Sequence, residues 1–295
     1  RTGGNYPDFT TEPCKRPMTI ADLLSHTSGL TYDFLEATEL DRAYRELGVG
    51  RLYRGATLQD MIDQLAKLPL EFSPGERWNY SVATDVLGYL IEVISGRSLP
   101  DFLHNTVFEP LGMVDTGFNI APEKAGRLAS CYQRDVNKQL ELTDDGQDSH
   151  YRDRTFFSGG GGLLSTATDY LRFCKMLLAG GTLDGRRVIG SRTLNLMTCN
   201  HLPGGQDMSR FALGSFSETA YNGVGFGLGF ANRLDRAANG SACSEGSYYW
   251  GGLASTLFWV DPREELIVIF MTQLIPSSIF NFRGQLESII YGALN

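Results

Sequence analysis

Apolar residues follow a helical period in the first part of this chain and form strand-like runs in the second part. One helical pattern ends at Ser95-Gly96 and comprises Val82, Val86, Leu87, Leu90, Ile91 and Ile94. β-Branched and aromatic residues then cluster at 225–230, 253–260 and 266–273. A turn at 261–264 lets the last two segments pair as an antiparallel hairpin. The chain is therefore predicted to be a mixed α/β protein of the α+β kind.

Helix starts carry a recurring capping pattern, a hydroxyl residue followed three positions later by Asp. The hydroxyl oxygen can accept a hydrogen bond from an exposed backbone N–H, and the carboxylate lies at the positive end of the helix. The pairs are Thr19/Asp22, Thr57/Asp60, Ser98/Asp101 and Thr166/Asp169. They predict helices and loops over most of residues 17–115.

Two further segments complete the predicted organisation. The amphipathic stretch 279–290 predicts a final helix across the sheet, and the acidic stretch 141–153 is expected to be a solvated loop. We therefore expect a mainly helical domain over residues 1–155 and a sheet-containing α/β domain over residues 156–295 that ends in a helix.

The charge balance argues against a polyanionic partner. The chain has 26 basic and 34 acidic residues, a net charge of −8, and no Lys/Arg run longer than Arg186-Arg187, so nucleic acid and anionic membranes are not expected to bind. The longest apolar run, 266–271, is far shorter than the roughly 18 residues of a spanning helix, so no membrane span is predicted. The expected partner is a small molecule.

The five cysteines indicate neither a disulfide scaffold nor a zinc site. Their number is odd, their spacing is wide, and no Cys-x-x-Cys or nearby His completes a ligand set; they are Cys14, Cys131, Cys174, Cys199 and Cys243. We expect reduced, mostly buried thiols, no metal and no cofactor. Reduced thiols and the lack of a visible leader before Arg1 favour the cytoplasm over the periplasm or secretion.

Three clusters of polar or glycine residues lie at the edges of predicted elements, at 73–82, 158–166 and 248–253. Each also has a purely structural interpretation. A Tyr before an amphipathic helix is most often a half-buried aromatic, and glycine pairs at a strand usually permit close packing. The glycines at 159–162 lack the Lys-Ser/Thr of a phosphate-binding loop, and His26 at a helix end is more often structural than catalytic.

Taken together, five motifs make the chain similar to a known family. They are residues 17–30 (PMTIADLLSHTSGL), 72–76 (FSPGE), 79–81 (NYS) followed by Leu87-Gly88, 108–113 (FEPLGM) and 250–252 (WGG). In order and spacing, from about residue 17 to the C-terminus, they resemble the serine β-lactamase-related family, and most closely its carboxylesterase branch. The resemblance implies a β-lactamase/transpeptidase-like fold, with an antiparallel sheet flanked by helices and a mainly helical domain.

The resemblance also implies an acyl-enzyme mechanism. In this family a Ser of a Ser-x-x-Lys motif attacks the carbonyl, a Tyr relays the proton with that Lys, and backbone N–H groups bind the oxyanion. Tyr80 matches the Tyr motif. The segment Trp250-Gly251-Gly252 matches the strand motif, which assigns an oxyanion donor to the backbone of Leu253.

The chain departs from the family at the nucleophile. Three positions before its five lysines stand Glu12, Gln64, Ala121, Asp135 and Arg172, so it contains no Ser-x-x-Lys. We expect that motif, with the first helix, the first strands and the nucleophile helix, in an N-terminal segment absent from this chain. A Tyr with an ordinary pKa of about 10 is roughly 0.1% ionised at neutral pH, so Tyr80 alone is expected to be idle.

Two substitutions favour esters as substrates. Trp250 stands where penicillin-recognising relatives carry a cation, and Val82 stands where they carry Asn, so a carboxylate partner and an amide hydrogen bond are both lost. The sequence therefore predicts a serine carboxylesterase acting on short acyl esters. A class C-like β-lactamase, a D-alanyl-D-alanine peptidase and a catalytically inactive scaffold or binding domain remain the alternatives, and the oligomeric state stays open.

Overall fold

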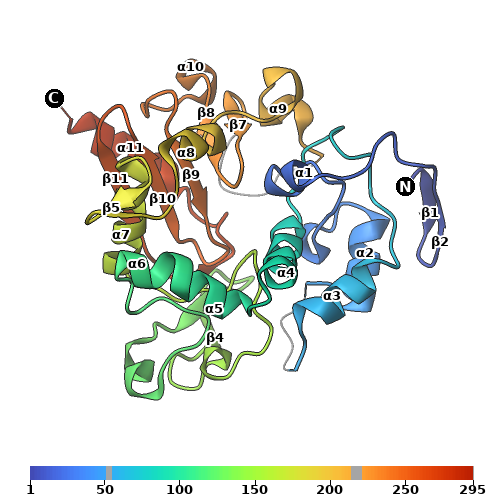
Figure 1. Ribbon diagram of the computed structural model, residues 1–295, viewed down its shortest axis with the longest axis horizontal. Helices are drawn as coiled ribbons and strands as arrows, with labels where there is room; N and C mark the ends of the chain where they lie inside the picture. Colours follow the sequence, from blue (N-terminus) through green and yellow to red (C-terminus); the bar gives the residue numbers. More distant parts are fainter. Residues whose placement is uncertain (51–54, 214–220, 295) are drawn as a thin grey trace.

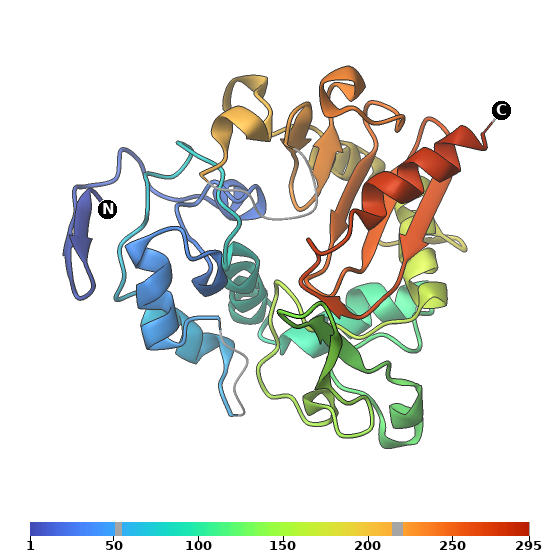
Figure 2. The same ribbon diagram turned by 180° about the vertical axis from the view of Figure 1, so that it is seen from behind.

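The computed structural model describes residues 1–50, 55–213 and 221–294. Helices and loops from the first part of the chain lie beside a sheet built by the last part (Figure 1). The reverse view shows the same two regions, with the hairpin of β1 (Gly3–Asn5) and β2 (Asp8–Thr10) at the outer edge of the helical region (Figure 2). The two predicted domains, 1–155 and 156–295, include residues 51–54, 214–220 and 295, which lie outside the described residues.

The helical region begins at the predicted caps. Its helices are α1 (Ile20–Leu24), α2 (Glu39–Leu47), α3 (Leu58–Leu65), α4 (Ala83–Ser95), α5 (Leu99–Leu103) and α6 (Glu109–Leu111). The side chains of Thr19, Thr57 and Ser98 each accept a hydrogen bond from the backbone N–H of the Asp three positions later, as predicted. Thr38 and Asp41 form the same box at α2, which the sequence analysis did not identify.

The main sheet has five antiparallel strands in the order β11-β10-β9-β8-β7. The strands are β7 (Val224–Phe226), β8 (Ala231–Arg233), β9 (Tyr248–Gly251), β10 (Leu257–Asp261) and β11 (Leu266–Phe270). The predicted β10–β11 hairpin is confirmed, with Asp261 opposite Leu266. The strand predicted from residue 253 begins at Leu257, because residues 252–255 form a turn closed by the Ser255 N–H on the Gly252 carbonyl at 3.0 Å.

Helices cover both faces of this sheet. Helix α11 (Phe282–Gly292) packs with Leu257 and Trp259 of β10, and α7 (Ala167–Leu178) packs with the alternate residues Phe258 and Val260. Successive strand residues point to opposite faces, so this alternation sets a helix–sheet–helix layering. The predicted antiparallel sheet flanked by helices, with a C-terminal helix, is confirmed.

Short elements connect these layers. They are β5 (Thr182–Leu183), β6 (Arg186–Arg187), α8 (Ser191–Met197), α9 (Met208–Phe211), α10 (Arg236–Asn239), the 3₁₀ turns at Asp33–Leu35, Pro122–Arg127, His150–Arg152 and Pro203–Gly205, and a π-helical turn at His104–Phe108.

A second sheet corrects one prediction. Its strands β3 (Cys131–Arg134), β4 (Leu140–Asp144) and β12 (Leu274–Ile275) take the order β12-β3-β4. The acidic stretch expected to be a loop therefore begins within a strand. Residues 140–143 are exposed on both faces of β4, so the apolar alternation that identifies a half-buried strand is absent. The pairing of β3 with β12 joins a strand of the predicted first domain to a strand of the predicted second domain. The domain boundary at residue 155 stays a proposal.

A shared aromatic cluster joins the helical region to the sheet. Trp78 precedes α4, packs against Phe226 of β7 and belongs to the same buried cluster as Tyr249 of β9 and Trp259 of β10. Within the described ranges no helix combines the length and apolar character that crossing a bilayer requires. All five cysteines are free thiols, of which Cys14 and Cys199 are exposed and the other three are buried.

Candidate functional site

Tyr80 lies in the segment that leads into α4, and this segment runs beside residues 26–31. The Asn79 backbone N–H donates to the His26 carbonyl at 2.9 Å. The side-chain amide of Asn79 donates to the Leu30 carbonyl at 3.0 Å. These bonds fix the main chain immediately before Tyr80 against the loop that follows α1.

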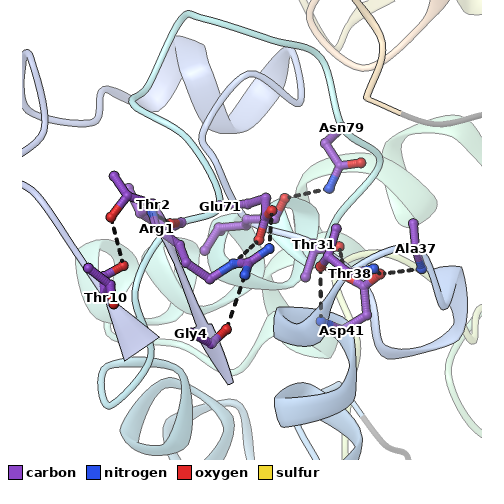
Figure 3. A network of polar contacts seen from close by, with 12 residues as sticks. Arg1, Thr2, Gly4, Thr10, Thr31, Ala37, Thr38, Asp41, Glu71 and Asn79 are labelled. Carbon is purple, nitrogen blue, oxygen red and sulfur yellow. Dashed lines mark hydrogen bonds and ion pairs between the residues drawn. The ribbon is translucent and has the colours of Figure 1, made fainter. Parts of the chain in front are cut away.

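The buried carboxylate of Asp41 anchors the continuation of that loop (Figure 3). It accepts hydrogen bonds from the Thr31 hydroxyl at 2.6 Å, the Ala37 N–H at 2.8 Å and the Thr38 N–H at 2.9 Å. Residues 31–38 are thereby held on the helical region. They include Tyr32, whose ring lies against Tyr80.

Trp250 on β9 meets Tyr80 across 170 positions of sequence. The indole Nε1–H points at the Tyr80 hydroxyl oxygen at 3.5 Å. The two ring centroids are 5.3 Å apart, and Phe226 packs edge-on against Trp250, also at 5.3 Å. The structure therefore brings together two residues that the sequence analysis took from separate motifs.

The hydroxyl of Tyr80 favours its protonated form. Burial raises the pKa of the phenol, and the negative charge of Asp85 raises it further, whereas the hydrogen bond from Trp250 acts in the opposite direction. Because the ordinary pKa of about 10 is already raised here, Tyr80 becomes a proton acceptor at neutral pH only beside an added positive charge.

Tyr32 and Asp85 belong to the same cluster and were missed by the sequence analysis. The Tyr32 ring lies 5.1 Å from that of Tyr80, and its hydroxyl donates to Asp85 at 3.5 Å. Burial raises the pKa of the Asp85 carboxyl, although hydrogen bonds from Ser158 and Gly160 favour its charged form. Asp85 follows Tyr80 by five positions on α4, but no motif or period in the sequence marks its burial.

The glycine run at 159–162 packs closely on this cluster. A Cβ on Gly159 would lie 2.1 Å from the Thr84 carbonyl oxygen, and a Cβ on Gly160 would lie 2.6 Å from the Tyr32 hydroxyl. No larger residue fits this approach without displacing α4 or Tyr32. Close packing thus explains Gly159 and Gly160, whereas a Cβ on Gly161 would meet nothing within 4 Å.

The strand motif lies at an open stretch of β9. Strand β8 pairs with β9 only at Asn232–Tyr248 and Ala231–Tyr249, so Trp250 and Gly251 continue past its end. On their other side they pair with β10. Among the described residues, the main chain of β9 is therefore unpaired on one side at the residues that follow Tyr249.

Leu253 lies in the turn that joins β9 to β10. The Gly252 N–H donates to the Thr256 carbonyl at 2.7 Å, and a Cβ on Gly252 would lie 2.3 Å from the Thr256 hydroxyl. The Leu253 side chain is 49% exposed, and its N–H makes no hydrogen bond within the described part of the chain.

Val82 and His26 are both buried. Val82 caps α4, is 0% exposed, and donates its N–H to the Thr31 carbonyl at 3.1 Å, so its side chain contributes to packing and does not reach the surface. His26 bonds to Ser81 through Nδ1 at 3.2 Å. Burial lowers the pKa of His26 to about 3, which keeps its imidazole neutral.

Acidic, cysteine and histidine side chains do not gather in groups of three or more that could hold a metal ion, as far as the described residues reach. A comparison with protein-family models matches the model described as Beta-lactamase over residues 5–281. The chain belongs to the beta-lactamase family.

Two curated relatives of this beta-lactamase family chain illustrate its similarity. The Mycobacterium tuberculosis protein Rv1367c is 36% identical over 90% of this chain and 65% of its own length. The esterase EstB of Burkholderia gladioli is 32% identical over 86% of this chain and 64% of its own length. The chain thus spans about 65% of the length of these relatives.

Solved structures place this family member in the β-lactamase/transpeptidase-like fold. EstCE1, a hydrolase with promiscuous acyltransferase activity, superposes with a TM-score of 0.76 at 27% identity. The match covers 94% of this chain and 72% of the EstCE1 chain. A simvastatin synthase variant from Aspergillus terreus has a TM-score of 0.74 at 26% identity, over 95% and 68% of the two chains. Known relatives of this beta-lactamase family chain thus include esterases and acyltransferases.

Proposed function

We propose that this chain carries the proton-relay and substrate-binding residues of a serine carboxylesterase that hydrolyses short acyl esters. In this proposal the nucleophilic Ser and its Lys belong to a segment outside these 295 residues. The observation that carries the proposal is the placement of Trp250 beside Tyr80, with the indole N–H 3.5 Å from the phenol oxygen.

Each residue has a role in the proposed reaction. Tyr80, held as the phenolate by the Lys ammonium, takes the proton of the Ser hydroxyl as the Ser oxygen attacks the ester carbonyl. The backbone N–H of Leu253 and that of the Ser stabilise the resulting oxyanion. When the C–O bond breaks, the proton passes through Tyr80 to the leaving alcohol, and water then hydrolyses the acyl-enzyme by the same route.

The raised pKa of Tyr80 supports the need for that Lys. Burial and the charge of Asp85 both disfavour the phenolate, so a cation must be placed beside it before it can accept a proton. Asp85 also provides a negative charge close to the site, where an incoming ammonium would be stabilised. We therefore infer that the 295-residue chain alone is inactive.

The apolar surroundings of Tyr80 support an uncharged substrate. Trp250 supplies an aromatic face and an N–H, but no positive charge for a substrate carboxylate. Phe226 and Tyr32 are buried against Trp250 and Tyr80 as apolar neighbours, and the buried Val82 presents no amide. These features favour a short acyl ester over a β-lactam or a peptide that ends in a carboxylate.

Fluorophosphonate labelling tests the proposal on both forms of the protein. The longest natural form should be labelled on one Ser of a Ser-x-x-Lys motif and should hydrolyse p-nitrophenyl butyrate. The 295-residue chain should be neither labelled nor active above buffer. Failure of the longest natural form to react would contradict the esterase and support the scaffold, whereas labelling of a Ser within this chain would reveal a nucleophile that the proposal does not contain.

We also propose a reducing compartment, and specifically the cytoplasm, for this protein. Five free thiols support this assignment, since Cys14 and Cys199 are exposed to oxidants. Measuring the thiol content of the protein isolated from its natural cell, with alkylation before lysis, tests it. Alkylation of all five of these cysteines is expected, and a disulfide at any of them would contradict the assignment.

A further inference from the structure

His26 has an unusual backbone conformation for its residue type. It follows α1 at the position where helices commonly end on glycine, with its N–H on the Leu23 carbonyl at 3.3 Å and the Thr27 N–H on the Asp22 carbonyl at 2.8 Å. Its φ of +55° lies in the left-handed region. Gly or Asn would adopt this conformation with less strain than His. The contacts of the imidazole should therefore account for a His at this position.

The imidazole lies beneath Tyr80 and touches the residue that follows it. Its ring centroid is 4.9 Å from that of Tyr80, at an interplanar angle of 59°. Its Nδ1 is 3.2 Å from the Ser81 hydroxyl oxygen. Phe226 closes a further side at 5.4 Å, and Trp78 at 6.0 Å. One side chain thus contacts the Tyr80 ring and is bonded to the adjacent residue.

The backbone of His26 acts on the same segment. Its carbonyl accepts the Asn79 N–H at 2.9 Å, so the main chain before Tyr80 and the side chain after it are both tied to one residue. The segment 79–81 is thereby clamped at two points that flank the phenol. The remaining freedom of Tyr80 is rotation about its χ1 and χ2 bonds, which the packing of its ring against the imidazole and against Trp250 restricts.

We propose that His26 is a positioning residue that sets the orientation of the Tyr80 ring for proton transfer. This inference rests on the proposed function, because it gives the orientation of Tyr80 a catalytic purpose. His26 carries no proton in the reaction and acts through Tyr80 alone. A small change in the χ1 angle of Tyr80 swings the whole ring and displaces its oxygen from the line between nucleophile and leaving group, and misplacement by about 1 Å can lower a rate about a hundredfold.

Three substitutions in the longest natural form separate positioning from folding. His26→Ala removes the ring and the bond to Ser81, whereas His26→Asn suits the left-handed backbone and places an amide where Nδ1 was. His104→Ala at an exposed histidine is the matched control. We expect His26→Ala to lower kcat for p-nitrophenyl butyrate about 10- to 100-fold with KM changed less than about threefold. His26→Asn should recover part of this loss, and His104→Ala should lose nothing.

A spectroscopic readout tests the inference without turnover. With 3-fluorotyrosine at position 80, ¹⁹F NMR should show one sharp resonance in the parent protein and in His26→Asn, and a broadened or split resonance in folded His26→Ala. A single unchanged resonance in His26→Ala would overturn the inference, even if the parent protein hydrolyses esters. Conversely, loss of ring order in a protein that fluorophosphonate does not label would sustain the inference about orientation and contradict the proposed function. A shift of the acidic limb of the pH profile of kcat in His26→Asn would also overturn the positioning inference, because His26 would then be a proton carrier.

Discussion

The guanidinium of Arg233 on β8 forms an ion pair with the carboxylate of Glu287 on α11, in the layer between the sheet and the C-terminal helix. Both side chains are almost completely buried. The other Glu287 oxygen accepts a hydrogen bond from the Ser241 hydroxyl at 2.8 Å, and the Arg233 guanidinium lies 5.0 Å above the Tyr249 ring. The pair therefore couples α11 to the strands that carry the candidate site.

Glu287→Gln should destabilise the protein by about 3 kcal/mol, because it leaves the Arg233 charge buried without a counter-charge. Glu123→Gln, at an exposed glutamate of the turn Pro122–Arg127, serves as the control and should change stability by less than about 0.5 kcal/mol. Urea unfolding followed by circular dichroism measures both. Equal midpoints for the two variants would show that the pair contributes nothing to the folded state.

Tyr80→Phe in the longest natural form should lower kcat at least about a hundredfold, since the variant keeps the ring and loses the proton relay. The melting temperature should stay close to that of the parent. Tyr132→Phe, at a tyrosine of β3 that is 40% exposed, is the matched control and should keep full activity. A Tyr80→Phe enzyme with more than about half the parent activity would return Tyr80 to a structural role.

Trp250→Lys should shift preference toward anionic substrates. A hydrogen-bonded cation beside a substrate carboxylate contributes about 1.5–3 kcal/mol, or about tenfold to a hundredfold in relative kcat/KM, reduced by the cost of holding that cation among aromatic rings. The measurement compares kcat/KM for nitrocefin and p-nitrophenyl butyrate in the longest natural form. Trp250→Phe, which adds no charge, should keep the parent ratio. An unchanged ratio in folded Trp250→Lys would mean that residue 250 does not line the substrate site.

The stability of the fold should decrease on acidification because of His26. In the unfolded chain this imidazole takes up a proton near pH 6.5, but in the folded protein it does so only near pH 3. The unfolded state therefore binds more protons between these values, and the folded state loses up to about 3–5 kcal/mol as the pH falls through this window. His26→Asn should flatten this dependence. Urea unfolding at pH 7, 5 and 4 checks it, and parallel curves for the two proteins would contradict it.

Local patterns identified most of the helices. Thr57 and Asp60, for example, mark the start of α3 by a chemistry that acts over three residues. Thr38 and Asp41 carry the same signal at α2. The sequence therefore contained the information for this helix start, although the sequence analysis did not identify it. Strand β4 was mistaken for a loop for a different reason, because exposure of both its faces removes the period on which recognition of a strand depends.

The candidate site was less accessible to such reasoning. The family motifs pointed to Tyr80 and Trp250, but no spacing between them predicts that their side chains meet. Asp85 is buried among Tyr32, Ser158 and Gly160, and these partners come from two segments that only the tertiary fold brings to α4. Polar residues of this kind carry no local periodic signal, and so they emerge only once the fold is known.

The separation of Tyr80 and Trp250 also has a consequence for biosynthesis. The two residues are 170 positions apart, so at about 5–20 residues per second Tyr80 is translated roughly 10–35 s before its partner on β9. For most of that interval Trp78 and Tyr80 lack Phe226, Tyr249 and Trp250, the strand residues that pack with them in the finished molecule. A nascent chain thus carries exposed aromatic surface on the ribosome, where a chaperone that binds such surface would act before any ester could be recognised.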